Sequence, residues 1–391
     1  MNKIKNHPTF QCYLKFIFTF FIFFFHSLNA NSSDCETEIF KIDRNFPSSN
    51  YSKCEILGKN SIRLYLSPED NLVTNPSPWF AFRKSAHTEE IYVELFYEKF
   101  EHRYHPKVSN DLVNWNKIDM DAIEIKDEGK RVTLTFKANE MASFISAQEI
   151  LSSSWYDNWY KNISYLENVI ISKIGRTSGG RSINKILIGN NSKNPYIFLF
   201  GRQHPPEVTG AFALRAFVEQ ILKDNNLSKE FLNKFNIISY PLVNPDGVDL
   251  GYWRHNLEAK DLNRDWGFFS QIETSMIYED IRKTLKGNEI ILVIDFHSTF
   301  QNIFYVQDQS DPTGYNFAND WLLKNSLINK YYKFEIKPTQ NKNNGVAKNY
   351  FNSSYNIPAI TYEVGDNTEK EIIIRSSKSF ANSMMSLLLD N

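Results

Sequence analysis

The sequence has 391 residues, of which 42% are hydrophobic and 23% charged, and its net charge is -1 at pH 7. This composition is typical of a globular protein that can bury a sizeable core. The near-zero charge and the lack of a basic stripe argue against a nucleic-acid partner. The length favours two domains.

The first thirty residues have the pattern of an export signal. Three lysines precede a ten-residue apolar run at 16–25, and small and polar residues follow it up to Ala30. We therefore predict a signal peptide over 1–30 that is cleaved after Ala30, so that the mature protein is periplasmic or secreted. The alternative is an uncleaved membrane anchor, but a bilayer-spanning helix needs about 20 apolar residues. No stable membrane insertion is expected after cleavage.

Three cysteines occur in the chain, and Cys12 falls inside the predicted signal. Cys35 and Cys54 remain as an even pair in an exported protein. We expect them to form one disulfide that closes a short N-terminal loop. Two unpaired thiols are the alternative, which an oxidising compartment disfavours.

The segment from 31 to 155 alternates short apolar runs with Pro, Asn, Asp and Ser, which favours a small antiparallel β-sandwich. Strands are predicted at 61–66, 79–82, 91–96 and 131–136. His102 and His105, three positions apart, are interpreted as a packed or surface pair in preference to metal ligands. Residues 151–170 are rich in Trp and Tyr and predict an aromatic connection between domains, or alternatively a surface helix with an apolar stripe.

Beyond this connection, strands and helices alternate, which is typical of a mixed, mainly parallel sheet covered by helices. After two short strands around a turn at 177–181, strands are predicted at 196–200, 236–243, 289–296, 303–306, 332–336 and 359–364. Helices are predicted at 208–222, 271–286, 315–326 and 376–389. The expected fold is therefore α/β with a flanked central sheet, preceded by the sandwich, and the second domain covers 156–391.

A possible metal site lies where two buried strands end. His204 and Glu207 follow the apolar strand that ends at Gly201, and ligands of open α/β sheets bind at the carboxyl ends of strands. His297 follows a second apolar strand in the same way. Two histidines and one glutamate form a known ligand set for hydrolytic Zn²⁺, and we predict one ion per chain.

Other polar residues come at similar places. Arg254 and Arg264 follow a turn at 244–247, and guanidinium groups near a metal suit an anionic substrate group and a developing oxyanion. Glu363 lies at or near the end of another apolar strand, where a carboxylate is costly unless it is paired or used. Beside an activated water it could act as a general base.

Taken in order, these residues resemble the zinc carboxypeptidase (metallocarboxypeptidase) family. The resemblance is strongest to its cytosolic-carboxypeptidase branch, which carries a β-sandwich before the catalytic domain. It covers about 60–390 and rests on the ordered set His204-x-x-Glu207, Asn244-Pro-Asp-Gly247, Arg254, Asp261-x-Asn263-Arg264, His297 and Glu363, with Trp79–Arg83 and Arg103–Ser109 in the sandwich.

The resemblance implies a role for each matching residue. His204, Glu207 and His297 would hold Zn²⁺, and Glu363 would be the base. Arg254 would polarise the scissile carbonyl and stabilise its oxyanion. Asn263 and Arg264 would clamp the terminal carboxylate of a peptide substrate, and Asp261 would orient a histidine ligand. Lys348 would lie on the floor of the specificity pocket and favour an acidic C-terminal residue, and a surface lysine in a loop is the alternative.

The sequence departs from the family in two respects. The digestive members have a mobile tyrosine before the base, whereas this neighbourhood is Gln340–Asn344 with no tyrosine. A signal peptide is also unlike the cytosolic branch, so tubulin cannot be assumed as the substrate.

Three functions follow as hypotheses. The first is an exported zinc carboxypeptidase acting on peptides with a free C-terminal carboxylate. The second is a zinc amidohydrolase acting on N-acyl amino acids, and the third is a catalytically inactive secreted binding module. The sequence does not determine the natural substrate, the oligomeric state or a role for the sandwich.

Overall fold

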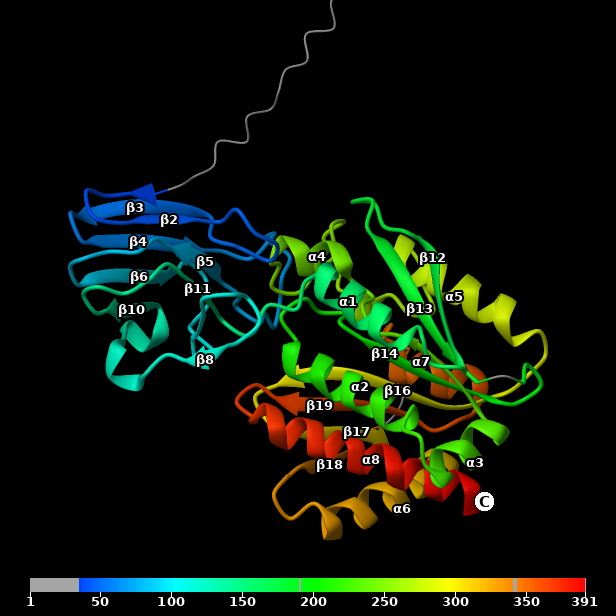
Figure 1. The fold of residues 1–391 in the computed structure, drawn as a ribbon. Helices are drawn as coiled ribbons and strands as arrows, with labels where there is room; N and C mark the ends of the chain where they lie inside the picture. The colour runs from blue at the N-terminus through cyan, green and yellow to red at the C-terminus, as the bar shows by residue number, and fades with distance from the viewer. Residues whose placement is uncertain (1–34, 190, 340–342, 391) are drawn as a thin grey trace, which may run out of the picture. The chain divides into compact units, whose positions relative to one another are not determined.

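The structure is a computed structural model that describes residues 35–189, 191–339 and 343–390 (Figure 1). The predicted signal peptide over 1–30 and residues 340–342 of the Gln340–Asn344 stretch lie outside this part of the chain. Residues 33–391 form one compact unit, and the predicted boundary between 155 and 156 falls inside a helix. None of the helices in the described ranges is both long enough and apolar enough to cross a membrane.

The N-terminal part consists of two β-sheets, as predicted. In spatial order, the strands of the first sheet are β1 (Cys35–Glu36), β2 (Lys41–Asp43), β5 (Ala81–Lys84), β11 (Ser143–Ser146), β7 (Lys107–Ser109) and β8 (Asn116–Lys117). Those of the second are β3 (Lys53–Gly58), β4 (Ser61–Leu66), β6 (Ile91–Tyr97), β10 (Arg131–Phe136) and β9 (Ile123–Lys126). Neighbouring strands are antiparallel except β4 and β6, which are parallel.

The alternation of apolar residues explains why these strands form a sandwich. In β4, β6 and β10 every second side chain is buried, because successive side chains of a strand point to opposite faces. The predicted disulfide is present and joins Cys35 of β1 to Cys54 of β3, with the two Cα atoms 6.0 Å apart. It therefore links the two sheets.

The larger part of the chain forms an eight-stranded mixed sheet, which confirms the predicted fold class. In spatial order, its strands are β12 (Val169–Arg176), β13 (Ser182–Ile188), β15 (Asn236–Tyr240), β14 (Tyr196–Gly201), β16 (Ile290–Thr299), β19 (Ala359–Gly365), β17 (Ile303–Gln307) and β18 (Glu335–Thr339). The central strands β15, β14, β16 and β19 run parallel to one another. Their carboxyl ends therefore meet at one edge of the sheet.

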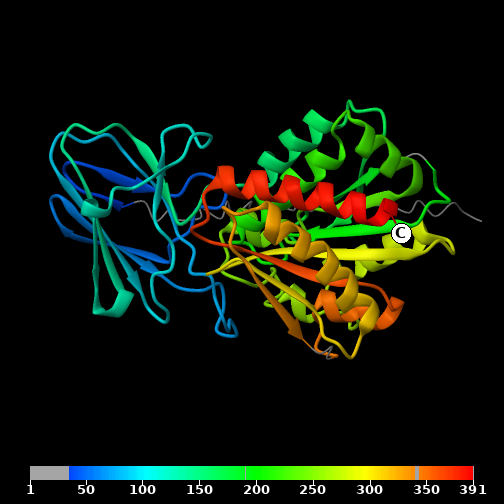
Figure 2. The ribbon, with the colours of Figure 1, turned by 90° about the horizontal axis from the view of Figure 1, so that it is seen from below.

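Helices cover both faces of this sheet (Figures 1 and 2). The helices are α1 (Ser153–Ile163), α2 (Val208–Ile221), α3 (Asn226–Lys234), α4 (Pro245–Leu250), α5 (Ile272–Leu285), α6 (Pro312–Ile328), α7 (Ala347–Tyr355) and α8 (Lys370–Asp390). Strand β14 is buried along its whole length. Ile197 and Leu199 join a core with α2, α6 and α8, whereas Phe198 and Phe200 join a second core with α5 and α7.

Several predicted bounds differ from the structure. Strand β16 continues to Thr299, so it contains His297, which was expected beyond the strand end. The turn predicted at Asn244–Gly247 opens the short helix α4, where the Asn244 side chain accepts a hydrogen bond from the Gly247 N–H. The aromatic connection is helix α1, and its face with Tyr156, Trp159 and Tyr160 is buried. Helices α3 and α7 were not predicted.

Candidate metal and substrate site

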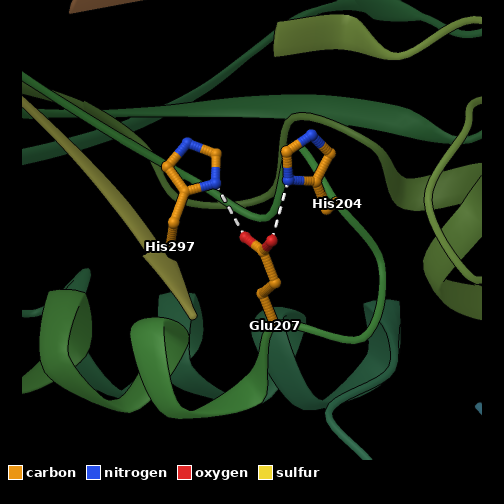
Figure 3. Close-up of side chains that lie close together, drawn as sticks. All are labelled: His204, Glu207 and His297. Atoms are coloured by element: carbon orange, nitrogen blue, oxygen red, sulfur yellow. Dashed lines mark hydrogen bonds and ion pairs between the residues drawn. The ribbon is translucent and has the colours of Figure 1, made fainter. Parts of the chain in front are cut away.

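Three side chains predicted as metal ligands converge in the structure (Figure 3). The two oxygens of the Glu207 carboxylate face one histidine each. Oε1 lies 2.8 Å from Nδ1 of His204, and Oε2 lies 2.7 Å from Nδ1 of His297. One ligand atom from each residue lies within 4.8 Å of the other two, and all three side chains are buried.

The parallel strands bring these residues together. Strand β14 ends at Gly201, and the chain then passes through His204 to Glu207, the residue directly before the first turn of α2. In the neighbouring strand β16, Phe296 pairs with Gly201, so that His297 comes level with the end of β14. Helix α2 approaches β16 closely because residue 210 is glycine: a Cβ atom there would lie 2.5 Å from the carbonyl oxygen of His297.

A carboxylate holds the far nitrogen of each histidine. Asp261 Oδ1 lies 2.9 Å from Nε2 of His204, and Asp295 Oδ2 lies 2.7 Å from Nε2 of His297. This arrangement leaves both Nδ1 atoms directed at the Glu207 carboxylate. Such partners fix the ring orientation of a metal-binding histidine and raise its basicity.

Asp261 was expected to orient a histidine, but Asp295 was missed. A signal for it was available, because Asp295 precedes His297 by two positions, and residues so spaced in a strand point to the same face. Asp295 is also fully buried, in the apolar run of β16 that precedes His297. Its Oδ2 accepts a second hydrogen bond from Gln203 Nε2 at 2.8 Å.

The donor set fits Zn²⁺, which takes imidazole nitrogen and carboxylate oxygen in hydrolytic sites. Burial tends to raise the pKa of Glu207, but His204 and His297 outweigh it and hold that pKa well below its ordinary value. The carboxylate is therefore ionised, as a metal ligand must be. Two imidazoles and one carboxylate thus surround a point that suits a divalent cation.

Glu363 lies beside the predicted ligands. It belongs to β19, where it pairs in register with His297 of β16. Its Oε2 is buried and has no hydrogen-bond partner among the described residues. Burial, partly offset by His297, raises the pKa of Glu363 to about 7. A carboxyl group with a pKa in this range can both accept and donate a proton near neutral pH.

Arg254 is held from two sides. Its Nε and Nη2 donate to Oδ2 of Asp261 at 2.8 and 2.7 Å, and its Nη1 donates to the carbonyl oxygen of Asn75 at 3.1 Å. Asp261 therefore joins Arg254 to His204, which fixes the distance between the guanidinium and the predicted metal.

Asn263 and Arg264 lie in a 3₁₀ turn (Leu262–Arg264) that contacts helix α7. Asn263 Oδ1 accepts the N–H of Ala347 at 2.8 Å, and Asn263 Nδ2 lies 3.2 Å from Nε2 of His297. The Arg264 guanidinium donates to the carbonyl oxygen of Asn263 at 2.7 Å. The residues predicted to bind the substrate's terminal carboxylate are thus hydrogen-bonded to the start of α7.

One cavity of about 600 Å³ is lined by five of these residues: Glu207, Glu363, Arg254, Asn263 and Arg264. Four of its lining residues are basic and two are acidic: Arg103, Arg254, Arg264 and Lys348, with Glu207 and Glu363. Tyr305 of β17 also lines it, so this cavity contains a phenol although the Gln340–Asn344 stretch has none. The excess of positive charge suits an anionic substrate.

Lys348 was placed near the pocket floor only by resemblance, with a surface loop as the alternative. In the structure it is buried near the start of α7 and lines the cavity. Burial lowers the pKa of Lys348 to about 8, although Asp308 and Asp311 partly offset this effect.

The sandwich also contributes to the cavity, which the sequence did not indicate. Asn75, Ser77 and Arg103 line it alongside the groups of the α/β part. Arg103 Nε donates to Asp366 Oδ2 at 2.8 Å. The neighbouring histidines are packed residues: His102 Nδ1 lies 2.8 Å from the Tyr97 hydroxyl, and His105 Nε2 lies 2.6 Å from the carbonyl oxygen of Ile118.

Comparison with known proteins agrees with this geometry. A family model described as zinc carboxypeptidase matches residues 156–383. Cytosolic carboxypeptidase 3 of Mus musculus is 32% identical over 120 residues, which are 29% of this chain and 12% of that protein. Cytosolic carboxypeptidase 2 of Xenopus tropicalis is 30% identical over 141 residues, which are 33% of this chain and 15% of that protein. The matches thus span less than one sixth of these relatives.

Solved structures extend the likeness of the fold to the sandwich. A metallo-carboxypeptidase from Burkholderia cenocepacia has a TM-score of 0.76 at 16% identity and covers 89% of this chain and 99% of its own. A metallo-carboxypeptidase from Pseudomonas aeruginosa, in complex with (2-guanidinoethylmercapto)succinic acid, has a TM-score of 0.70 at 18% identity, with coverage of 89% and 98%. The resemblance stated from the sequence is confirmed.

Proposed function

Because the chain belongs to the zinc carboxypeptidase family, we propose that it hydrolyses the last peptide bond of peptides with a free C-terminal carboxylate. One observation carries this proposal above the others. The three metal donors lie together, and one of them, Glu207, lines the same cavity as Glu363 and two arginines. The buried Oε2 of Glu363 has no hydrogen-bond partner among the described residues. Metal-assisted hydrolysis requires this combination of a metal, a base and cationic groups.

His204, Glu207 and His297 would hold one Zn²⁺ per chain. When bound, the ion acts as a Lewis acid toward the carbonyl group and lowers the pKa of a water molecule. Asp261 and Asp295 keep the two imidazole rings turned so that their Nδ1 atoms face the Glu207 carboxylate, where the ion would bind.

Glu363 would move the proton. It takes a proton from the water whose oxygen attacks the carbonyl carbon, and it delivers a proton to the nitrogen as the C–N bond breaks. A pKa near 7 supports this double role, because the same carboxyl must be deprotonated before attack and protonated before cleavage.

The cationic groups would bind the substrate. The Arg254 guanidinium contacts the carbonyl oxygen and stabilises the negative charge that develops there, an effect of about 3 kcal/mol for one donor in comparable sites. Arg264 and the Asn263 amide contact the terminal carboxylate, and a planar guanidinium suits a bidentate contact with it.

The proposal is tested with purified protein and a set of peptides that differ only in their C-terminal residue, together with N-acyl amino acids. We expect release of the C-terminal residue that a chelator abolishes and Zn²⁺ restores. Preferential cleavage of N-acyl amino acids would support the amidohydrolase instead. Zinc binding without turnover of either set would indicate a binding protein.

We further propose that Lys348 selects acidic C-terminal residues. A lysine in the cavity wall offers a cation to a glutamate side chain. Replacing Lys348 by Ala should lower kcat/KM for C-terminal Glu far more than for C-terminal Leu. The preference of the wild type for Glu over Leu should also fall as the pH rises through about 8, because the lysine then loses its charge.

The ratio of the two kcat/KM values is the quantity to measure, because effects of pH on the metal and the base cancel in it. A partly exposed lysine on β18, Lys337, pairs with Glu335 and provides the matched control, and Lys337→Ala should leave the ratio unchanged. Equal losses on both peptides in Lys348→Ala would refute the role of Lys348.

We also propose that the protein is exported, in a periplasmic or secreted location. The disulfide between Cys35 and Cys54 supports this, because disulfides persist in oxidising compartments. N-terminal sequencing of the mature protein should begin at Asn31, and an intact Met1 would favour a retained anchor.

A further inference from the structure

A loop of the sandwich accepts hydrogen bonds from the backbone around Arg254. Glu69, in the link between β4 and β5, accepts hydrogen bonds from three successive backbone N–H groups. Its Oε2 accepts from Trp253 at 2.7 Å, and its Oε1 accepts from Arg254 at 2.9 Å and from His255 at 2.5 Å. Bonds of this kind to an ionised carboxylate are stronger than those to a neutral acceptor.

The same loop holds the side chain of Arg254. Six residues beyond Glu69, the carbonyl oxygen of Asn75 accepts from Arg254 Nη1 at 3.1 Å. Asp261 holds the opposite edge of the guanidinium. The backbone and one edge of this side chain are thus fixed by the sandwich, whereas the other edge is fixed by the α/β part.

Further hydrogen bonds from the sandwich hold the rest of the segment 251–255. The indole N–H of Trp253 donates to the carbonyl oxygen of Trp79 at 2.9 Å, and Asn50 Nδ2 donates to the carbonyl oxygen of Gly251 at 2.6 Å. Trp253 is fully buried. The segment 251–255 therefore depends on the sandwich for its conformation.

Glu69, Asp70 and His255 lie close enough together to hold a metal ion. The contacts of Glu69 argue against that use. Both of its oxygens already accept backbone N–H groups, and Asp70 Oδ2 lies 2.8 Å from Nδ1 of His255. The polarised N–H groups would also repel a cation near the carboxylate, so the cluster is better suited to holding the backbone.

We infer that Glu69 is a positioning residue for Arg254, and that the sandwich thereby completes the catalytic site. The inference rests on the proposed function, in which the Arg254 guanidinium contacts the scissile carbonyl. Without the carboxylate, three buried N–H groups lose their acceptor and the segment 253–255 shifts. A displacement of about 1 Å in such a group can lower the rate about 100-fold.

The experiment compares Glu69→Ala and Glu69→Gln with the control Glu124→Ala, which removes an exposed carboxylate of the sandwich. Hydrogen exchange is measured at the amides of 253–255 and along β16. In Glu69→Ala we expect faster exchange at 253–255 with unchanged protection of β16. We also expect a fall in kcat of about 10- to 100-fold with KM within about twofold.

A double-mutant comparison separates positioning from general support of the fold. If Glu69 acts through Arg254, Glu69→Ala should lower kcat much less in an Arg254→Ala background than in the wild type. Glu69→Gln keeps one acceptor oxygen and should give a smaller loss of kcat. This variant still tests the inference if Glu69→Ala folds poorly.

The inference would be overturned by an equal loss of kcat in both backgrounds. It would also be overturned by unchanged amide exchange at 253–255, or by faster exchange there without any loss of kcat. A wild type without chelator-sensitive hydrolysis would instead overturn the proposed function. In that case amide exchange would still decide whether Glu69 holds the segment.

Discussion

Replacing Glu363 by Gln should lower kcat by about 100- to 10,000-fold while one zinc ion stays bound per chain. The amide has nearly the same size and shape but cannot accept a proton from water at neutral pH. Glu363 makes no hydrogen bond through its buried Oε2 within the described part of the chain, so the substitution breaks no observed contact there. The folded state should therefore survive unchanged.

The measurements are kcat and KM on the best peptide of the C-terminal set, with metal content determined on the same sample. Glu335→Gln on the exposed edge of β18 serves as the control and should retain full activity. Turnover close to that of the wild type in Glu363→Gln would show that another group is the base.

Replacing Glu207 by Gln should remove the metal and, with it, the activity. The Glu207 carboxylate lies between the two Nδ1 atoms and supplies the negative charge of the donor set. An amide offers one weak oxygen donor, and its NH₂ group would face an imidazole nitrogen. We expect zinc affinity to fall by more than the roughly 10- to 100-fold that loss of an outer partner of a ligand costs.

Zinc affinity is measured by competition with a chelator of known affinity, so the result does not depend on turnover. Glu219→Gln is the matched control, because Glu219 lies on the same helix α2 and pairs with Arg215 at the surface. The control should bind zinc as the wild type does. Unchanged zinc affinity in Glu207→Gln would contradict the assignment of the ligands.

Much of the site can be predicted from the sequence, because the apolar pattern shows where a buried strand ends. An unbroken apolar run such as Tyr196–Phe200 marks a strand buried on both faces. Polar residues directly after it, His204 and Glu207, must then lie at the edge of the sheet. The order of the remaining site residues along the chain was enough to indicate the family and the fold.

The local pattern does not show where an element ends when tertiary pairing extends it. Strand β16 continues through His297 and Ser298 because β19 supplies partners for both residues. Helix α7 has few apolar residues and was not predicted, yet packing of Ala347 and Phe351 against the sheet stabilises it. In both cases, contacts from distant parts of the chain outweigh local preference.

The sequence by itself determined the strand periodicity, the disulfide pair and the types of residue that we propose hold the metal and move the proton. Only the tertiary structure decided which other side chains orient these site residues or line the cavity beside them. Asp295 orients His297, Lys348 faces the cavity from a buried position, and Glu69 reaches Arg254 across 185 positions of the chain. Periodicity reports which face of an element is buried, whereas a contact between distant segments depends on how those faces pack.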